Sequence, residues 1–182
     1  VMGAHPKNTD FFPLTVEYEE KYYAAGKIKG SKWIKRETRP SEEAILSARL
    51  IDRTVRPRFS HDMRNEVQIV ATILTFDGQN DPDMVALFGA GLALMISDIP
   101  FNGPVAGARV GRVDGKLVFN PTYAERKLSD FDIVVSGTSQ KINMLEAGAK
   151  IIPEKDMAHA IEEAFKAYQP LIELQNKIAQ EL

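Results

Sequence analysis

The feature that most constrains the fold is an uncharged, mostly apolar stretch of 14 residues from Met84 to Ser97. It is shorter than the roughly 20 residues that a membrane-spanning helix needs. The preceding run Asn80-Asp81-Pro82-Asp83 is a turn that can cap a helix, so we predict a helix over 83–97. A helix that is apolar on nearly every side is normally buried in the middle of a domain. The rest of the chain must therefore supply the layers that cover it.

The composition is adequate for such a core. Hydrophobic residues make up 44% and charged residues 26% of the 182 residues, as is typical of a soluble globular protein. This length favours one domain with room for a short appended element. The absence of cysteine excludes a disulfide scaffold, a zinc ribbon and a thiol nucleophile. The start lacks the layout of a signal peptide and is not a Met, so we expect a piece of a longer protein.

Alternating and β-branched runs predict strands on both sides of this helix. The predicted strands cover 11–26, 67–76 (buried on both faces), 105–113 and 116–119 (a hairpin around Asp114-Gly115), 131–136 and 142–147. A final helix is predicted from Pro153 onward, split or kinked after Tyr168 or Gln169 because of Pro170. This order of elements is typical of a mixed α+β fold.

A further helix is predicted from Ser41, as its N-cap, to about Val55. Its apolar stripe consists of Ala44, Ala48, Ile51 and Val55. A second stripe, about 140° away around the helix, consists of Arg49, Arg53 and Arg56. We expect all three guanidinium groups to be exposed, where they face phosphate or RNA or take part in a contact between subunits.

Basic charge is concentrated between Lys27 and Arg64, where eleven Lys and Arg residues stand against five Asp and Glu residues. Within this region, the run Lys32-Trp33-Ile34-Lys35-Arg36 and the nearby Arg39 lie in a predicted loop over 27–40. An aromatic ring among cations suits single-stranded nucleic acid, because the ring stacks on a base while the cations neutralise phosphates. The alternatives are a solvated basic face, or a Trp33 packed on the domain with the arginines paired to neighbouring carboxylates.

Other chemistry has little support in the sequence. The three histidines lack metal-type spacing and are expected to be structural: His5, His61 and His159. Asp81 and Asp83 could hold a magnesium ion, but a turn and helix cap explains them as well, and Asp130 and Asp132 border a strand. We find no Ser/His/Asp arrangement and no phosphate-binding GxxxxGK[ST] loop.

Several short motifs together resemble the polynucleotide phosphorylase family, in the family's order over roughly residues 10–150. The motifs are Asp10-Phe11-Phe12-Pro13-Leu14-Thr15-Val16, Tyr23-Ala24-Ala25-Gly26-Lys27-Ile28, Arg39-Pro40-Ser41-Glu42, Arg49-Leu50-Ile51-Asp52-Arg53, Asn65-Glu66-Val67-Gln68, Ile99-Pro100-Phe101-Asn102-Gly103-Pro104 and Asn120-Pro121-Thr122. The tail from Pro153 resembles the start of the helical domain that joins the family's two cores.

The resemblance implies an RNase PH-like core of the ribosomal protein S5 domain 2-like kind, N-terminally incomplete, over 1–150. Residues 151–182 would begin the all-helical linker domain. Because the family core begins earlier, with strands of the same sheet, we expect a sheet edge or core face to be left uncovered. The implied location is the bacterial cytoplasm or an organelle, and no membrane is involved.

The implied activity is that of a nucleotidyltransferase, namely processive 3′-to-5′ phosphorolysis of RNA to nucleoside diphosphates in RNA degradation. By resemblance it uses inorganic phosphate and Mg²⁺, the metal being held by a second core outside this chain. The implied partners are single-stranded RNA, two further copies in a homotrimeric ring and proteins of an RNA-degradation complex. The alternative is a non-catalytic, RNA-binding ring subunit of an exosome-like complex.

The resemblance also assigns roles to residues. Trp33, Ile34, Lys35 and Arg36 match the family's channel-neck loop, although Ile34 replaces its usual second aromatic residue. We expect these four residues and Arg39 to bind RNA. The resemblance places no catalytic or metal-binding residue in this segment, so we expect the isolated chain to be inactive.

Overall fold

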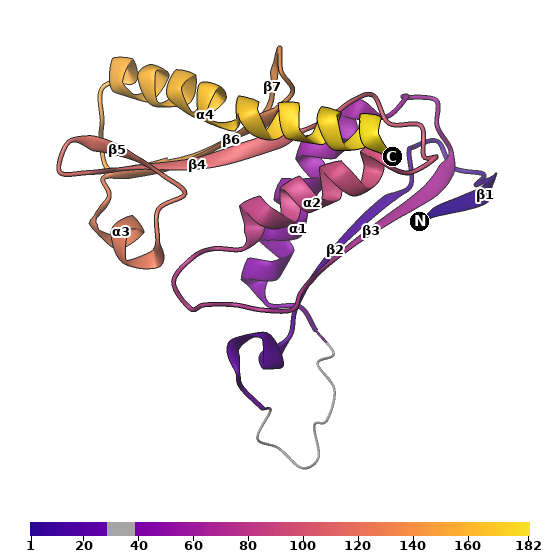
Figure 1. Cartoon of the computed structure of the whole chain (residues 1–182), viewed down its shortest axis with the longest axis horizontal. Coiled ribbons are helices and arrows are strands. Elements are labelled where there is room, and N and C mark those ends of the chain that lie inside the picture. The colour runs from indigo at the N-terminus through magenta and orange to yellow at the C-terminus, as the bar shows by residue number, and fades with distance from the viewer. Residues whose placement is uncertain (29–38) are drawn as a thin grey trace.

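The structure, a computed structural model, describes residues 1–28 and 39–182, which form two β-sheets and the helices that cover them (Figure 1). The elements are β1 (Met2–Pro6), β2 (Leu14–Glu20), α1 (Glu42–Val55), β3 (Asn65–Ile73), α2 (Asp83–Met95), β4 (Ala106–Val113), β5 (Lys116–Phe119), α3 (Tyr123–Leu128), β6 (Phe131–Gly137), β7 (Ile142–Ala149) and α4 (Glu154–Glu181), with short 3₁₀ helices η1 (Tyr22–Ala25) and η2 (Arg56–Arg58). The predicted α+β class is confirmed. The described helices include none that is long and apolar enough to cross a membrane.

The first sheet has the strand order β1-β3-β2. Strand β2 runs parallel to β3, with Leu14 opposite Val67 and Glu20 opposite Ile73. Strand β1 is antiparallel to β3 but pairs only with its first residues, and the last backbone bond on this side joins Val1 to Gln68. Beyond Gln68, this edge of β3 has no partner strand among the described residues. An uncovered sheet edge is what the sequence led us to expect.

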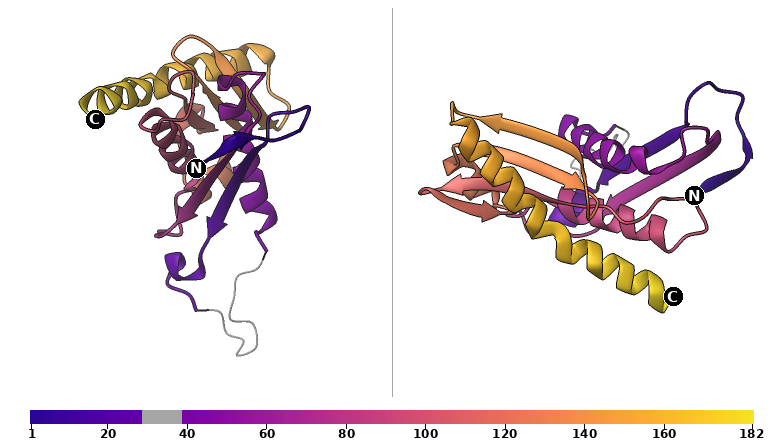
Figure 2. Two further views of the ribbon diagram at one scale, coloured as in Figure 1. Left: turned by 90° about the vertical axis from the view of Figure 1, so that its right-hand side faces the viewer. Right: turned by 90° about the horizontal axis from the view of Figure 1, so that it is seen from above.

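The two faces of β3 differ. Val67, Ile69 and Ile73 pack in a core with α1 and α2, whereas Val70 and Leu74, on the other face, are 48% and 64% exposed. The prediction that this strand is buried on both faces is therefore wrong. Helices cover this sheet on one side only (Figure 2), so a β-branched sequence occupies a half-exposed strand.

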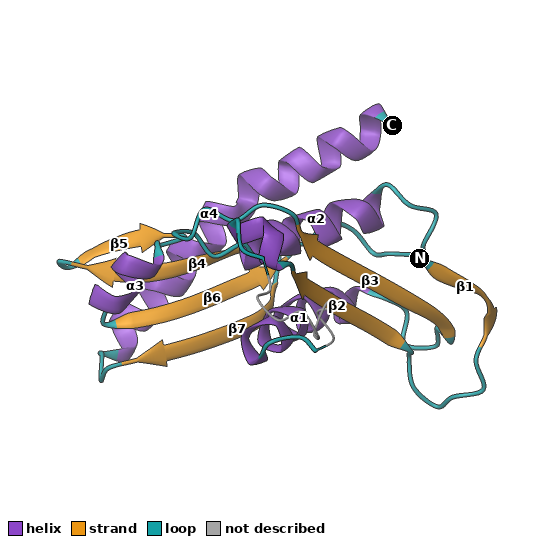
Figure 3. Ribbon diagram, turned by 90° about the horizontal axis from the view of Figure 1, so that it is seen from below, coloured by secondary structure: helices purple, strands orange, loops and turns teal. Residues whose placement is uncertain are grey.

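The second sheet is antiparallel, with the order β5-β4-β6-β7, and lies end to end with the first (Figure 3). The predicted hairpin between β4 and β5 is confirmed. Asp114 and Gly115 both have positive φ, 50° and 76°, as a primed two-residue turn requires. Helix α4 packs against β4 and β6, and its Ala164, Tyr168 and Ile172 are buried in this second core.

Helix α4 continues through Pro170, so the predicted split does not occur, whereas a kink at this proline stays a prediction. Tyr168 and Ile172 are buried on either side of the proline, so both halves pack on the second core. The final turns pass alongside α2, where the Gln175 amide donates to the carbonyl oxygen of Val105 (2.9 Å). The division into a core over 1–150 and a helical linker from 151 stays a prediction.

Helix α2 is buried on one side and exposed on the other, contrary to the expected complete burial. Leu87 and Gly91 face the core, and a Cβ on Gly91 would lie 2.8 Å from the carbonyl oxygen of Val105. Val85 is 73% exposed, and nothing lies within 4 Å of the position of a Cβ on Gly89. The exposed side of α2 borders the same hollow as the unpaired edge of β3.

Candidate nucleic-acid interface

Helix α1 carries the predicted arginines, and Ser41 fixes its start. The Ser41 hydroxyl accepts a hydrogen bond from the N–H of Ala44 (3.0 Å) and donates to Glu20 Oε2 at the end of β2 (2.8 Å). Glu42 and Glu43 lie in the first turn, where the helix dipole favours carboxylates. The predicted N-cap is confirmed, and the same side chain joins α1 to β2.

Arg49 and Arg53 lie one turn apart on the exposed side of α1, away from the buried Ile51 and Val55. Neither guanidinium forms an ion pair or hydrogen bond with any described residue. Arginine stays protonated at ordinary pH. The geometry therefore leaves two cations available to an anionic ligand.

Arg56 behaves differently and corrects the expectation of three equally exposed guanidinium groups. It is half-buried, and it pairs with Asp52 at 2.6 Å. It also donates to the carbonyl oxygens of Phe12 and Leu14, both at 3.1 Å. For this residue, pairing with a neighbouring carboxylate, one of the alternatives left open by the sequence, is what the structure shows.

The predicted RNA-binding loop is only partly described. Trp33, Ile34, Lys35 and Arg36 lie in the segment 29–38, outside the described residues, so their assignment stays a prediction. Arg39 follows this segment directly and is exposed. Its RNA contact also stays a prediction.

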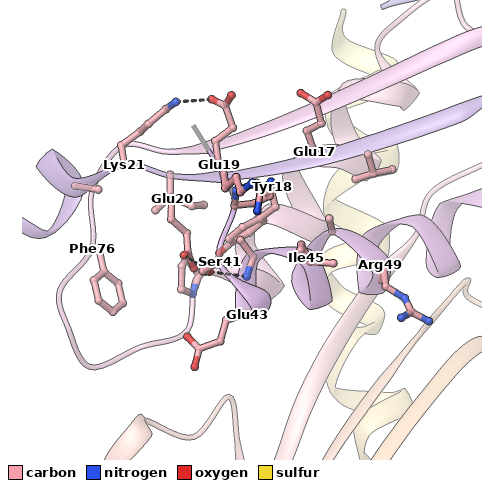
Figure 4. Close-up of a pocket in the computed structure, with 18 of the residues that line it drawn as sticks. Glu17, Tyr18, Glu19, Glu20, Lys21, Ser41, Glu43, Ile45, Arg49 and Phe76 are labelled. Atoms are coloured by element: carbon pink, nitrogen blue, oxygen red, sulfur yellow. Dashed lines mark hydrogen bonds and ion pairs between the residues drawn. The ribbon is translucent and has the colours of Figure 1, made fainter. Parts of the chain in front are cut away.

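Strand β2 and helix α1 form the walls of a hollow of about 1010 Å³ (Figure 4). Lys27 and Arg39 line it at the two ends of the segment 29–38, and Ile45 and Arg49 line it from α1. On β2, Glu20 extends toward Ser41 and α1, whereas Glu17 and Glu19 extend to the other face of the strand (Figure 4). Basic and acidic groups therefore alternate along the hollow, because Glu43 and Asp52 of α1 line it as well.

Two tyrosines border this hollow close to buried charge. Burial raises the pKa of the Tyr18 hydroxyl well above its usual value, and the nearby carboxylates of Asp81 and Asp83 add to the effect. Burial and Asp81 also raise the pKa of Tyr123 to about 12, although Arg126 opposes the shift. Both hydroxyls therefore stay protonated at neutral pH and do not serve as bases there.

Three carboxylates converge behind these tyrosines, from Asp81, Asp83 and Asp132. Arg109 contacts Asp83 at 2.5 Å and Asp132 at 2.9 Å, and Arg126 contacts Asp81 at 2.8 Å and Asp132 at 2.9 Å. Burial raises the pKa of Asp83, and the charge of Arg109 opposes the rise. The donor set does not fit a metal ion, because two guanidinium groups already neutralise it. Residues 1–28 and 39–182 contain no group of three or more potential ligand side chains that could hold a metal ion.

Sequence reasoning missed the way in which the fold captures Arg56. The (i, i+4) spacing of Asp52 and Arg56 was visible in the sequence, but the carbonyl oxygens of Phe12 and Leu14 come close only through the tertiary fold. Helix α3 was also missed. Its signal was present, because Thr122 and Glu125 form a capping box.

Comparison with known proteins agrees with this fold. The family described as 3′ exoribonuclease family, domain 1, matches residues 1–100, and domain 2 of the same family matches residues 103–167. The crystal structure of rice (Oryza sativa) Rrp46 superimposes with a TM-score of 0.73 at 10% identity, over 98% of this chain and 79% of that one. At this identity the likeness concerns the fold alone.

Bacterial relatives are much closer in sequence. The chain is 55% identical over 174 residues to the polyribonucleotide nucleotidyltransferase of Anoxybacillus flavithermus, covering 96% of this chain and 25% of that protein. It is 53% identical over 175 residues to the enzyme of the same name from Bacillus mycoides, covering 96% and 24%. The chain thus spans about a quarter of the length of these relatives. Since the domain 1 match alone covers more than half of its residues, the chain belongs to the 3′ exoribonuclease family.

Proposed function

We propose that this chain is the RNA-binding, ring-forming part of a phosphorolytic 3′-to-5′ exoribonuclease that acts in RNA degradation. The family membership and the polyribonucleotide nucleotidyltransferase relatives support the reaction class. The observation that carries the RNA-binding role is the pair of exposed guanidinium groups, Arg49 and Arg53, which have no carboxylate partner among the described residues.

The chemistry of the hollow suits a single strand of RNA. Arg49, which lines the hollow, and Arg53, one turn further along α1, would contact phosphates, and each such contact releases counterions, which makes binding salt-dependent. The apolar side chain of Ile45 lies on the same wall, one turn before Arg49, and can pack against a ribose or base. Arg39 lines the same hollow, and we propose that it binds RNA together with Trp33, Ile34, Lys35 and Arg36.

Inorganic phosphate is proposed as co-substrate and Mg²⁺ as cofactor. Phosphorolysis brings an anionic nucleophile to an anionic chain, so it needs positive charge at the reacting centre. The converging carboxylates of this chain are already neutralised by Arg109 and Arg126. We therefore propose that the metal and the phosphate are held by a part of the longer protein outside these residues.

The assembly and the location are proposals as well. We propose a homotrimeric ring around an RNA channel, acting in the bacterial cytoplasm or in an organelle, with proteins of an RNA-degradation complex as further partners. The bacterial origin of the relatives supports the location.

The test is phosphorolysis by the intact protein. Oligo(A) RNA is incubated with phosphate and Mg²⁺, and the release of nucleoside diphosphate is measured. We expect the double variant R49A/R53A to raise the RNA concentration needed for half-maximal rate. The matched control K116A/K177A removes two exposed lysines that do not line the hollow, and should change nothing. RNA binding without any phosphorolysis by the intact protein would instead identify a non-catalytic ring subunit.

A further inference from the structure

We infer that Arg56 is a positioning residue, which holds α1 at a fixed distance from β2 and thereby aims Arg49 and Arg53 at the RNA. This inference rests on the proposed RNA-binding function of that surface. Under this inference Arg56 does not itself contact RNA, because its guanidinium group already binds partners within the fold.

Arg56 forms a clamp with three partners. Its Nε donates to Asp52 Oδ2 (3.0 Å), and Nη2 donates to Asp52 Oδ1 (2.6 Å) and to the carbonyl oxygen of Leu14 (3.1 Å). Its Nη1 donates to the carbonyl oxygen of Phe12 (3.1 Å), and the guanidinium lies 5.8 Å from the centre of the Phe12 ring. To contact a phosphate, the group would have to break several of these bonds. The exchange would leave the Asp52 carboxylate and two backbone carbonyl oxygens without this donor, which offsets the gain from a phosphate contact.

The clamp lies at one of two points that tie α1 to β2. At the other point, Ser41 at the start of the helix donates to Glu20 at the end of the strand (2.8 Å). At the Arg56 attachment, Arg56 at the end of the helix donates to the carbonyl oxygen of Leu14 at the start of the strand. The hollow lies between the two attachments, and Leu14, Asp52 and Arg49 all line it. A shift at the Arg56 end would therefore change the width of the hollow and the direction of Arg49.

An arginine suits this position better than a lysine. The guanidinium presents a planar fork of donors that reaches two backbone carbonyls and both oxygens of Asp52 at once. A lysine keeps the charge but has a single ammonium group on a flexible stem and cannot make this set of bonds. The conservative replacement thus separates the geometry of Arg56 from its charge.

The experiment measures binding of fluorescein-labelled oligo(A) to the intact protein over a series of salt concentrations. We expect R56K to weaken binding about tenfold, or about 1.4 kcal/mol, with the wild-type salt slope, because Arg49 and Arg53 keep their phosphate contacts in a poorer geometry. We expect D52N, which retains Arg56 but loosens the clamp, to weaken binding in the same direction. Thermal unfolding of each variant shows that it is folded at the assay temperature, and D52N provides the test should R56K fail to fold.

Three outcomes would overturn the inference. A salt slope lower by about 0.7 in R56A, the value for one phosphate contact on a single strand, would show that Arg56 contacts RNA directly. Unchanged or tighter binding by D52N would show the same, because that substitution removes a negative charge near the RNA. Wild-type affinity of a folded R56K would show that charge alone suffices. Failure of R49A/R53A to weaken binding would instead contradict the proposed function, and so the two failures are distinguishable.

Discussion

Arginines in the two halves of this molecule have opposite surroundings. Beside the second sheet, Arg112 pairs with Asp130 and Asp156, both at 2.7 Å, and Arg109 is held by carboxylates in the same way. On α1, Arg49 and Arg53 have no partner among the residues that the structure describes. A paired guanidinium stabilises the fold and is not free for a ligand, whereas an unpaired one contributes little to stability. The comparison teaches that pairing, rather than the number of basic residues, marks the surface available to an anionic ligand.

The largest expected effect is on stability, from the variant R109M. It leaves the Asp83 carboxylate, which is 2% exposed, without its closest partner. We expect the free energy of unfolding to fall by about 3–5 kcal/mol, as when one partner of a buried ion pair is removed. The matched variant R49M should change it by less than about 0.5 kcal/mol. Urea unfolding measures both, and equal losses would contradict the comparison.

The pH dependence of this loss has a definite sign. Burial already raises the pKa of Asp83, and loss of the Arg109 charge raises it further. The group then favours folding while it is protonated, and this stability is lost as the pH rises through the folded pKa. The penalty of R109M should therefore shrink in acidic buffer. A penalty that grows as the pH falls would contradict the burial of an unpaired carboxylate.

The two sides of α2 give the second contrast, between G91A and G89A. A Cβ on Gly91 meets the Val105 carbonyl oxygen at 2.8 Å and the Gln175 side chain at 3.2 Å, whereas a Cβ on Gly89 meets nothing within 4 Å. We expect G91A to destabilise by about 1–3 kcal/mol through overpacking. We expect G89A to stabilise by about 0.5–1 kcal/mol, because alanine loses less backbone entropy in a helix. Thermal unfolding measures the change in stability of each variant. A loss of stability in both variants, or a gain in both, would show that the two sides of α2 are packed alike.

The smallest effect is expected from D130N. The hydrogen bond from Arg112 lowers the pKa of the Asp130 carboxyl. A lowered folded pKa gives stability that is present above the ordinary pKa of about 3.9 and is lost as the pH falls through the folded value. Because this pair is partly exposed, D130N should cost less than about 1 kcal/mol at neutral pH. Its unfolding free energy should vary less with pH below about pH 4 than that of the wild type.

Local patterns predicted most of the elements but not their environment. The hairpin at Asp114-Gly115 and the N-cap at Ser41 follow from turn and cap chemistry, and both are present. The five-residue β1 was missed because Met2–Pro6 has no alternation and depends on β3 for its pairing. Gln175, which interrupts an apolar stripe, is buried because the Val105 carbonyl oxygen, 70 residues away in sequence, accepts its hydrogen bond.

The candidate site shows the same limit. A helical wheel places Arg49, Arg53 and Arg56 on one exposed side of α1. The predicted exposure is correct for Arg49 and Arg53. It fails for Arg56, because the carbonyl groups that capture this side chain belong to residues more than 40 positions earlier in the chain. The face of a helix can be predicted from spacing, whereas the partners on that face depend on tertiary contacts.

The measurement that tests the central claim most directly is the salt dependence of oligo(A) binding by the wild type and by R49A/R53A. If the two unpaired arginines contact phosphates, the slope of log affinity against log salt concentration should fall by about 1.4 in the double variant, since each contact on a single strand contributes about 0.7. The control K116A/K177A, which removes the same charge elsewhere, should keep the wild-type slope. An unchanged slope in R49A/R53A, or an equal fall in the control, would contradict the assignment of this face of α1 to RNA.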